Sequence, residues 1–197
     1  MISAIVLAAG SSSRLGRPKQ LLDLGGKPAL QHVMDAAARA GLDEVLVIVG
    51  HAAEEVTGAV RLPSLARFIH NPDYAQGQST SLRAGLREAG PTCRAALVLL
   101  GDQPGVRPDA IAAVAKAWRR GGGLVVQASY DGRPAHPSLF DRSVWPELER
   151  LDADEGARSV LAAHPDWLRR VEVGGLPPDD IDTEEAYERM KSEFGKA

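Results

Sequence analysis

The chain has 197 residues, of which 44% are hydrophobic and 25% charged, a balance typical of a globular protein and unlike that of a disordered or fibrous chain. The formal net charge of −3 argues against broad electrostatic binding to nucleic acid, so an anionic ligand must meet a local cluster of basic residues. Cys93 is the only cysteine, which excludes an intramolecular disulfide and a cysteine-based zinc site and favours a reducing, cytoplasmic compartment. We expect one domain over residues 1–197 and no membrane segment, because the apolar stretch from Ile2 to Ala9 is too short to span a bilayer.

Short apolar runs rich in β-branched residues alternate with helix-like segments through the first two thirds of the chain. The runs predicted to be strands are 2–8, 44–50, 66–70, 95–100 and 124–128. The segments predicted to be helices are 28–41, 52–60, 79–88 and 108–120. This alternation predicts an α/β fold with a Rossmann-like, doubly wound and mostly parallel sheet. Open sheets of this kind bind ligands at the carboxyl ends of their strands.

The pattern changes after Ala128. Residues 130–137 are rich in turn-forming residues and predict a loop. Short helices over 144–151 and 155–163, a strand over 168–173 and a last helix over 183–194 are expected to follow. We expect residues 129–178 to form a small lid or subdomain inserted in the α/β core.

The loop after the first predicted strand combines small residues with positive charge. It runs from Leu7 to Lys19 and contains two glycines, three serines, Arg14, Arg17 and Lys19. Small residues let backbone N–H groups approach an anion, and the basic side chains add charge, so the loop is similar to a polyphosphate cradle. It lacks the Gly-Lys-Ser/Thr of a Walker A loop and the Gly-x-Gly-x-x-Gly of a dinucleotide site. The alternative is a solvated loop with incidental charges.

Two aspartates are candidate metal ligands. Asp102 follows the strongest apolar run and should emerge at the carboxyl edge of a central strand, where a carboxylate can hold Mg²⁺ against phosphate oxygens. Asp182 precedes the last predicted helix. The alternatives are a turn or capping role for Asp102 and, with Thr183 as the other candidate, a helix-cap role for Asp182.

Two further segments carry candidate binding residues. Residues 71–82 lead into a predicted helix, where Gly77, Ser79 and Ser81 could bind a polar ligand, with a capping role for Ser79 as the alternative. His136 lies between prolines in the predicted loop, where it could contact a substrate or be incidental.

Taken together, these segments are similar to those of a known family. Leu7-Ala-Ala-Gly10 with Arg14, Gly16 and Lys19 resembles the signature of the MobA-like nucleotidyltransferases. The stretch 71–82, Leu100-Gly-Asp-Gln-Pro104 and Asp180-Ile-Asp-Thr183 resemble the molybdenum cofactor cytidylyltransferase branch. The likeness extends from Ile2 to about Met190.

The resemblance implies Mg²⁺-dependent transfer of CMP from CTP to the phosphate of a molybdopterin-type acceptor, with release of pyrophosphate. It implies that Arg14, Lys19 and Asp102 are catalytic and that Asp102 and Asp182 bind the metal. The nucleotide-binding residues that it implies are Leu7, Ala8, Ala9, Gly10, Arg14, Lys19, Gly77, Ser79 and Ser81. His136 and Gln103 would bind the acceptor, within or beside residues 129–178. A molybdoenzyme or its chaperone would receive the product.

Three alternatives stay open. Ala9 resembles the cytidylyl branch, whereas the guanylyl branch tends to have glycine there. The cytidylyltransferase of isoprenoid synthesis shares Pro18-Lys-Gln20, but it has a different motif where this chain has Gly101-Asp-Gln-Pro104. The third alternative is a catalytically idle nucleotide-binding module, such as a chaperone for a molybdoenzyme, against which the intact Arg14, Lys19, Asp102 and Asp182 argue.

Overall fold

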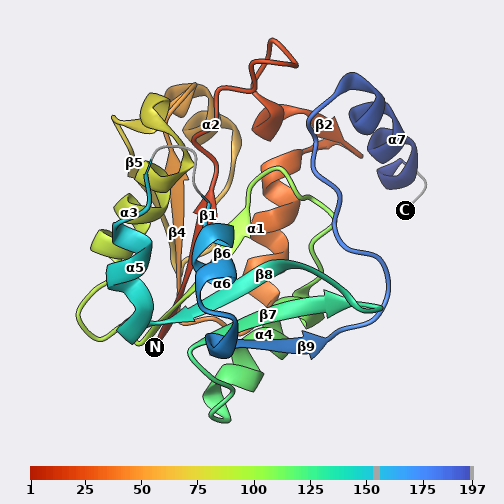
Figure 1. The fold of residues 1–197 in the computed structure, drawn as a ribbon. Coiled ribbons are helices and arrows are strands. Elements are labelled where there is room, and N and C mark those ends of the chain that lie inside the picture. The colour runs from red at the N-terminus through yellow and green to blue at the C-terminus, as the bar shows by residue number, and fades with distance from the viewer. Residues whose placement is uncertain (153–155, 196–197) are drawn as a thin grey trace.

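The computed structural model describes residues 1–152 and 156–195, and its main feature is a seven-stranded sheet (Figure 1). The strands, in sheet order, are β5 (Ala66–His70), β4 (Glu44–Val49), β1 (Ile2–Leu7), β6 (Ala95–Leu100), β8 (Arg133–Asp141), β7 (Val125–Tyr130) and β9 (Leu168–Glu172). Strand β8 runs antiparallel to both neighbours, and the other pairs of neighbours are parallel. The prediction of an α/β fold with a mostly parallel sheet is confirmed.

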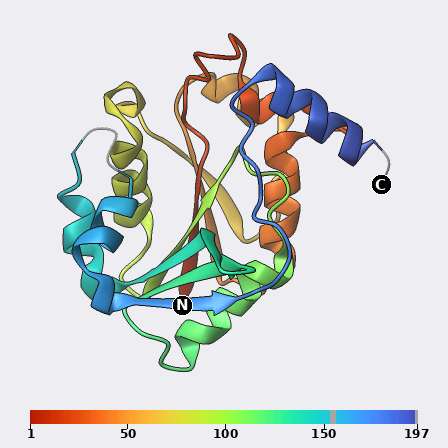
Figure 2. The same ribbon diagram turned by 45° about the vertical axis from the view of Figure 1, so that its right-hand side comes forward.

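Helices cover both faces of this sheet (Figure 2). One layer consists of α1 (Ala29–Arg39), α2 (Ala53–Ala59) and α4 (Pro108–Arg119), and the other of α3 (Gln78–Glu88), α5 (Trp145–Glu149) and α6 (Arg158–Ala163). Side chains alternate along β1, so that Ala4 and Val6 face the first layer and Ile5 the second. Burial on both faces explains why the strand sequences are apolar without polar alternation.

The C-terminal helix α7 (Glu184–Phe194) lies apart from these two layers. It packs beside a two-stranded sheet made of β2 (Asp23–Leu24) and β3 (Lys27–Pro28), where Leu24, Ile181 and Tyr187 share a small core. Figure 1 shows both elements near the loop that follows β1. The 3-10 helices are η1 (Lys19–Leu21), η2 (Tyr74–Gln76), η3 (Arg142–Val144) and η4 (Pro165–Trp167). Within residues 1–152 and 156–195, no helix has the length and hydropathy required to cross a membrane.

The segment after β7 differs from the prediction. The expected loop over residues 130–137 is wrong, because residues 133–141 form β8, which pairs with both β6 and β7. Asp131 and Gly132 have φ values of 48° and 81° and make the tight turn of the β7–β8 hairpin. An Asp-Gly pair between strands is a hairpin signal, and it accounts for the turn-rich composition.

Strands β8 and β9 therefore belong to the main sheet, although they lie in the segment 129–178. The predicted helix over 144–151 is observed as η3 and α5. Of the helix expected over 155–163, residue 155 lies outside the described residues and α6 covers Arg158–Ala163.

Candidate active site

Four charged side chains from distant parts of the chain meet at the carboxyl edge of β1 and β6. Lys19 begins η1, Asp102 follows β6, and Asp182 precedes α7. The Lys19 ammonium donates to Asp102 Oδ2 and, over 2.9 Å, to Asp182 Oδ1. The Arg14 guanidinium lies 3.2 Å from the other oxygen of Asp182. One cluster thus contains the residues that sequence reasoning had proposed for catalysis and metal binding.

The pairing shifts the ionisation of these groups. Burial lowers the pKa of Lys19, but the charges and hydrogen bonds of Asp102 and Asp182 outweigh it, so the net pKa is raised. The hydrogen bond from Lys19 is the main reason why the pKa of Asp182 is lowered. The Lys19 and Asp102 side chains are only 17% and 15% exposed, whereas that of Arg14 is 69% exposed. The inner pair is therefore shielded from water, and Arg14 covers it on the solvent side.

Backbone contacts hold the two carboxylates near the loop after β1. The Gly101 N–H donates to the Leu7 carbonyl over 2.9 Å, and a Cβ at Gly101 would lie 3.0 Å from that oxygen. Glycine therefore permits the close approach of the two strand ends. The Ile181 N–H donates to the Asp102 carbonyl over 3.1 Å, and the buried Ile181 side chain anchors the residue before Asp182.

Neither aspartate acts as a helix cap. The residue that precedes α4 is Arg107, and Asp102 is engaged with Lys19 instead. The N-cap of α7 is Thr183, whose hydroxyl accepts from the Ala186 N–H over 3.2 Å. The capping alternatives for Asp102 and Asp182 are therefore wrong.

The loop after β1 has the geometry of an anion cradle. Ser12 adopts a left-handed conformation with φ of 52°, and its carbonyl accepts from the Leu15 and Gly16 N–H groups over 3.0 and 3.1 Å. Its hydroxyl accepts from the Lys19 N–H over 3.0 Å. Within the described part of the chain, the N–H groups of residues 10–14 donate to no carbonyl or side chain. Such a run of available N–H groups can bind phosphate oxygens.

A first cavity, of about 690 Å³, opens over this loop. The residues predicted to bind nucleotide or metal that line it are Leu7, Ala9, Gly10, Arg14, Lys19, Gly77, Ser81 and Asp102. Ala8 does not line it, because its side chain is buried in the core below. Gln20 and Tyr74 line the cavity and were missed by sequence reasoning, although both lie within or beside the quoted motifs.

A second cavity, of about 860 Å³, adjoins the first. The two share Leu7, Gln78 and Leu100 in their linings. Gln103 and His136, the two residues proposed for the acceptor, line the second cavity. Arg158 of α6 and Arg170 of β9 also line it, and Arg170 was missed because an isolated arginine on a strand carries no motif.

The two serines of α3 face different surroundings. Ser81 lines the first cavity, and its hydroxyl accepts from the Asn71 side-chain amide over 3.0 Å. Ser79 lines the second cavity rather than the first. Its side chain is buried, makes no cap hydrogen bond to α3 and leaves Oγ without a partner. The capping alternative for Ser79 is therefore wrong.

His136 lies on β8 and not on a loop. Burial lowers the pKa of its imidazole, although a hydrogen bond to the Val98 backbone and the charge of Asp102 act in the opposite direction. The ring is therefore neutral near pH 7. Its Nδ1 is buried and has no hydrogen-bond partner.

The cluster fits a divalent cation. Oxygens of Asp102 and Asp182 approach one ammonium group, so they lie close enough to bind one cation together. Mg²⁺ typically takes one or two carboxylates together with substrate phosphates and water. Among the described residues, no group of three or more metal-binding side chains occurs, so a metal held here would need oxygens from a ligand.

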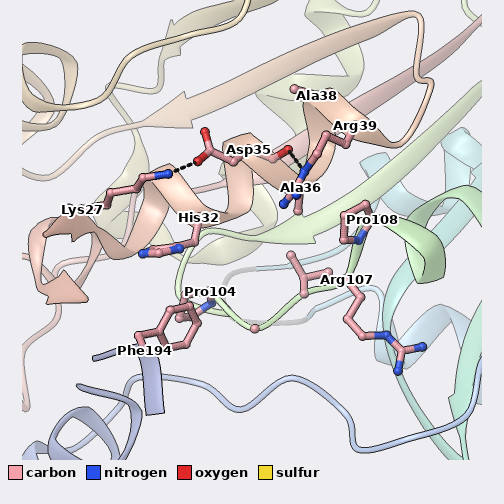
Figure 3. A pocket seen from close by; sticks show the side chains of 12 residues that line it. Lys27, His32, Asp35, Ala36, Ala38, Arg39, Pro104, Arg107, Pro108 and Phe194 are labelled. Carbon is pink, nitrogen blue, oxygen red and sulfur yellow. Dashed lines mark hydrogen bonds and ion pairs between the residues drawn. The ribbon is translucent and has the colours of Figure 1, made fainter. Parts of the chain in front are cut away.

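A third cavity, of about 660 Å³, lies away from this cluster, between α1 and the loop that leads to α4 (Figure 3). Lys27 and Asp35 form an ion pair of 2.8 Å at its edge, and His32 packs against Phe194 with ring centroids 4.6 Å apart. None of the residues proposed for catalysis lines this cavity.

Comparisons with known proteins agree with this geometry. The sequence profile of the MobA-like NTP transferase domain matches residues 4–168. The crystal structure of Rv0371c from Mycobacterium tuberculosis H37Rv is 31% identical, with a TM-score of 0.87 over 97% of each chain. A manganese complex of the same protein is 30% identical, with a TM-score of 0.82 over 97% of each chain.

Two further relatives have different names. The bifunctional protein GlmU of Bordetella petrii is 30% identical over 193 residues, which cover 87% of this chain and 41% of that protein. This chain thus spans about two fifths of the length of the GlmU relatives that it matches. The nicotine blue oxidoreductase of Paenarthrobacter nicotinovorans is 28% identical over 199 residues, which cover 96% of each chain.

Proposed function

The chain belongs to the MobA-like NTP transferase family, and we propose that it transfers CMP from CTP to the phosphate of a molybdopterin-type acceptor, with release of pyrophosphate. The observation that carries the proposal is the cluster of Lys19, Asp102 and Asp182 beside two adjoining cavities. The first cavity, with the anion cradle, suits the nucleotide. The second suits the acceptor, and the product would then pass to a molybdoenzyme or its chaperone.

In the proposed reaction, an oxygen of the acceptor phosphate forms a bond to the α-phosphorus of CTP. The bond from that phosphorus to the oxygen bridging the α- and β-phosphates breaks, and pyrophosphate leaves. A phosphate monoester has a second pKa of about 6, so the nucleophile is already a dianion near neutral pH and needs no general base. The reaction instead requires neutralisation of charge and alignment of the two phosphates.

The residues of this chain can meet both requirements. Lys19 and Arg14 would neutralise charge on the phosphates, and the N–H groups of residues 10–14 would bind the leaving pyrophosphate. The shared wall of the two cavities at Leu7, Gln78 and Leu100 would let the acceptor approach the α-phosphate from the side of the second cavity. A Mg²⁺ ion held by Asp102 and Asp182 would polarise the phosphate when bound.

The choice of CTP rests on Ala9, whose methyl group is buried and lines the first cavity. A methyl group there fills space that a purine would need, whereas the guanylyl branch tends to have glycine. This supports cytidylyl over guanylyl transfer. Isoprenoid-pathway cytidylyl transfer stays the alternative with the same base and another acceptor.

The name of the P. nicotinovorans relative raises a second class of activity. This chain lacks the Gly-x-Gly-x-x-Gly of a dinucleotide site, and its anion cradle contacts a carboxylate pair suited to a metal–phosphate complex. These features favour nucleotidyl transfer over oxidation or reduction. They also argue against an idle nucleotide-binding module, which has no need of the shielded charge cluster.

The test is to incubate the pure protein and Mg²⁺ with CTP, GTP, UTP or ATP, with and without molybdopterin, and to measure pyrophosphate. We expect release only with acceptor, and most with CTP. A separate assay with NADPH and a redox dye, without NTP, tests for oxidoreductase activity. Three outcomes would contradict the proposal. They are pyrophosphate release that needs no acceptor, more pyrophosphate release with GTP than with CTP, and NADPH oxidation without any nucleotidyl transfer.

A further inference from the structure

Buried polar atoms without a partner gather in the second cavity. Four such side-chain atoms occur among the described residues, and three of them, Ser79 Oγ, Gln103 Oε1 and His136 Nδ1, belong to residues that line this cavity. Buried polar atoms in folded proteins are almost always hydrogen-bonded, so a concentration of exceptions in one cavity points to a ligand that completes them.

The direction of the Gln103 amide is fixed by its neighbour. Gln103 Nε2 donates to Asp180 Oδ1 over 2.8 Å. An ionised carboxylate only accepts hydrogen bonds, so the amide nitrogen must face Asp180 and the amide oxygen must face away from it. The Gln103 side chain is 6% exposed, which leaves little room for another arrangement. The atom of Gln103 that is left without a partner is therefore a hydrogen-bond acceptor, Oε1.

His136 adds a second group that lacks a partner. Its Nδ1 is buried and unpaired, and in a neutral ring this nitrogen donates or accepts according to the tautomer. Ser79 Oγ can donate or accept. A ligand that satisfies these groups must supply N–H or O–H donors, and a phosphate dianion, which only accepts, does not match Gln103.

We propose that the Gln103 amide oxygen accepts hydrogen bonds from N–H donors on a ring of the acceptor that takes no part in the reaction. Asp180 is the positioning residue that keeps this oxygen turned toward the second cavity. The inference rests on the proposed function, because it takes the second cavity as the acceptor site. The matching chemical group is a nitrogen heterocycle with an exocyclic amino group beside a ring N–H. Asp180 also lines the second cavity, and in this assignment it acts through its hydrogen bond with Gln103.

The test compares two phosphate-free probes, 6-hydroxymethylpterin and 6-hydroxymethyllumazine, which differ in an amino group against a carbonyl at the same ring position. Binding is measured by fluorescence quenching without CTP or metal. We expect the wild type to bind the pterin about tenfold more tightly, because the lumazine carbonyl would face the Gln103 oxygen. Equal binding, or no binding of either probe, would overturn the inference.

Two variants test Asp180. Asp180→Asn lets the Gln103 amide turn over, since the introduced amide can donate or accept, and the pterin preference should fall toward onefold. Adding Gln103→Glu to Asp180→Asn reverses the hydrogen bond and again presents an acceptor oxygen to the cavity, so the preference should return. Asp179→Asn is the matched control, because Asp179 pairs only loosely with Arg189, at 3.8 Å, and should keep the wild-type ratio.

A merely structural role of Asp180 would lower the binding of both probes equally and would not be rescued by the double variant. An unchanged ratio in Asp180→Asn, or a double variant without recovery, overturns the inference. Pyrophosphate release from CTP, assayed on the same preparations, separates the two proposals. Turnover without ring preference rejects this inference alone, whereas ring preference without turnover under any condition rejects the proposed function alone.

Discussion

The two adjoining cavities satisfy their polar groups in different ways. Beside the first, the charged groups bind one another, since Lys19 joins Asp102 to Asp182 and Arg14 pairs with Asp182, and one buried polar atom of the lining, Gln20 Oε1, lacks a partner. In the second, three buried polar atoms of the lining lack partners, and Ser79 Oγ is an example. A preformed charge cluster suits a charged group common to many substrates, such as a phosphate chain. Unsatisfied neutral groups suit selection among ligands, because a wrong ligand leaves them unpaired.

The largest effect is expected from removing the Lys19 ammonium, the cation of the first cavity. Lys19→Ala should lower kcat by roughly two to three orders of magnitude, the scale observed when one transition-state donor is removed. Steady-state pyrophosphate release at saturating CTP measures it. Lys19→Arg is the matched control, because it keeps the charge and should retain more activity than the alanine variant.

The same variant tests the fold. With Lys19 removed, the poorly exposed Asp102 faces Asp182 without a shared cation, so some loss of stability is expected. Thermal unfolding with and without Mg²⁺ distinguishes the two effects, because a bound metal should restore stability but not turnover. Wild-type turnover in Lys19→Ala would show that Lys19 has no role in the reaction.

A second prediction concerns the carboxylate pair. Asp102→Asn and Asp182→Asn should each lower turnover by at least about tenfold, the lower end of what loss of a metal-site partner costs. Because both oxygens approach one cation, the double variant should be hardly worse than the poorer single variant. A Mg²⁺ titration of all three variants measures this. Fully multiplicative losses with unchanged Mg²⁺ dependence would mean that the two aspartates act at separate sites.

A third prediction concerns base choice in the first cavity. One methyl group in a pocket accounts for about a 10- to 200-fold preference, so the wild type should use CTP well above GTP. Ala9→Gly should narrow the gap without reversing it, because glycine opens the cavity and loosens the backbone. The measurement is kcat/KM for both nucleotides in both proteins. A wild type that prefers GTP contradicts the cytidylyl assignment, and an unchanged ratio in the variant contradicts the steric explanation.

The sequence predicts the first cavity better than the second for a physical reason. The cradle is one continuous segment, and Asp102 follows the most apolar run, so the rule that parallel strands end at one edge predicts their meeting. Asp182 was harder to place from the residues alone, because a carboxylate before a helix is also a good cap. Only the hydrogen bond of Thr183 to the α7 backbone decides against that role.

The second cavity is assembled from elements that no local pattern connects. The turn-rich composition predicts a loop at His136, whereas Asp131 and Gly132 make a hairpin turn that places His136 on β8. The hydrogen bond between Gln103 and Asp180 joins residues 77 positions apart. Periodicity predicts which face of an element is buried, but not which side chain of another element lies opposite. The sequence therefore predicts the α/β class and the mostly parallel sheet, whereas it does not predict these contacts.

The smallest predicted effect distinguishes the role of the helix cap, Thr183, from that of the neighbouring carboxylate, Asp182. Thr183→Ala should lower the free energy of unfolding by about 1 kcal/mol, because the Ala186 N–H loses its side-chain partner. For a chain of this length that corresponds to a fall in Tm of about 2 to 4 °C, measured by calorimetry. Thr183→Ser keeps the hydroxyl and should retain most of the stability. Because Asp182 directly precedes the cap, fraying of α7 should also reduce the activation of pyrophosphate release by Mg²⁺. The preference for the pterin over the lumazine probe in the second cavity should stay unchanged. A variant that loses ring selectivity together with stability would mean that the two cavities are not independently built.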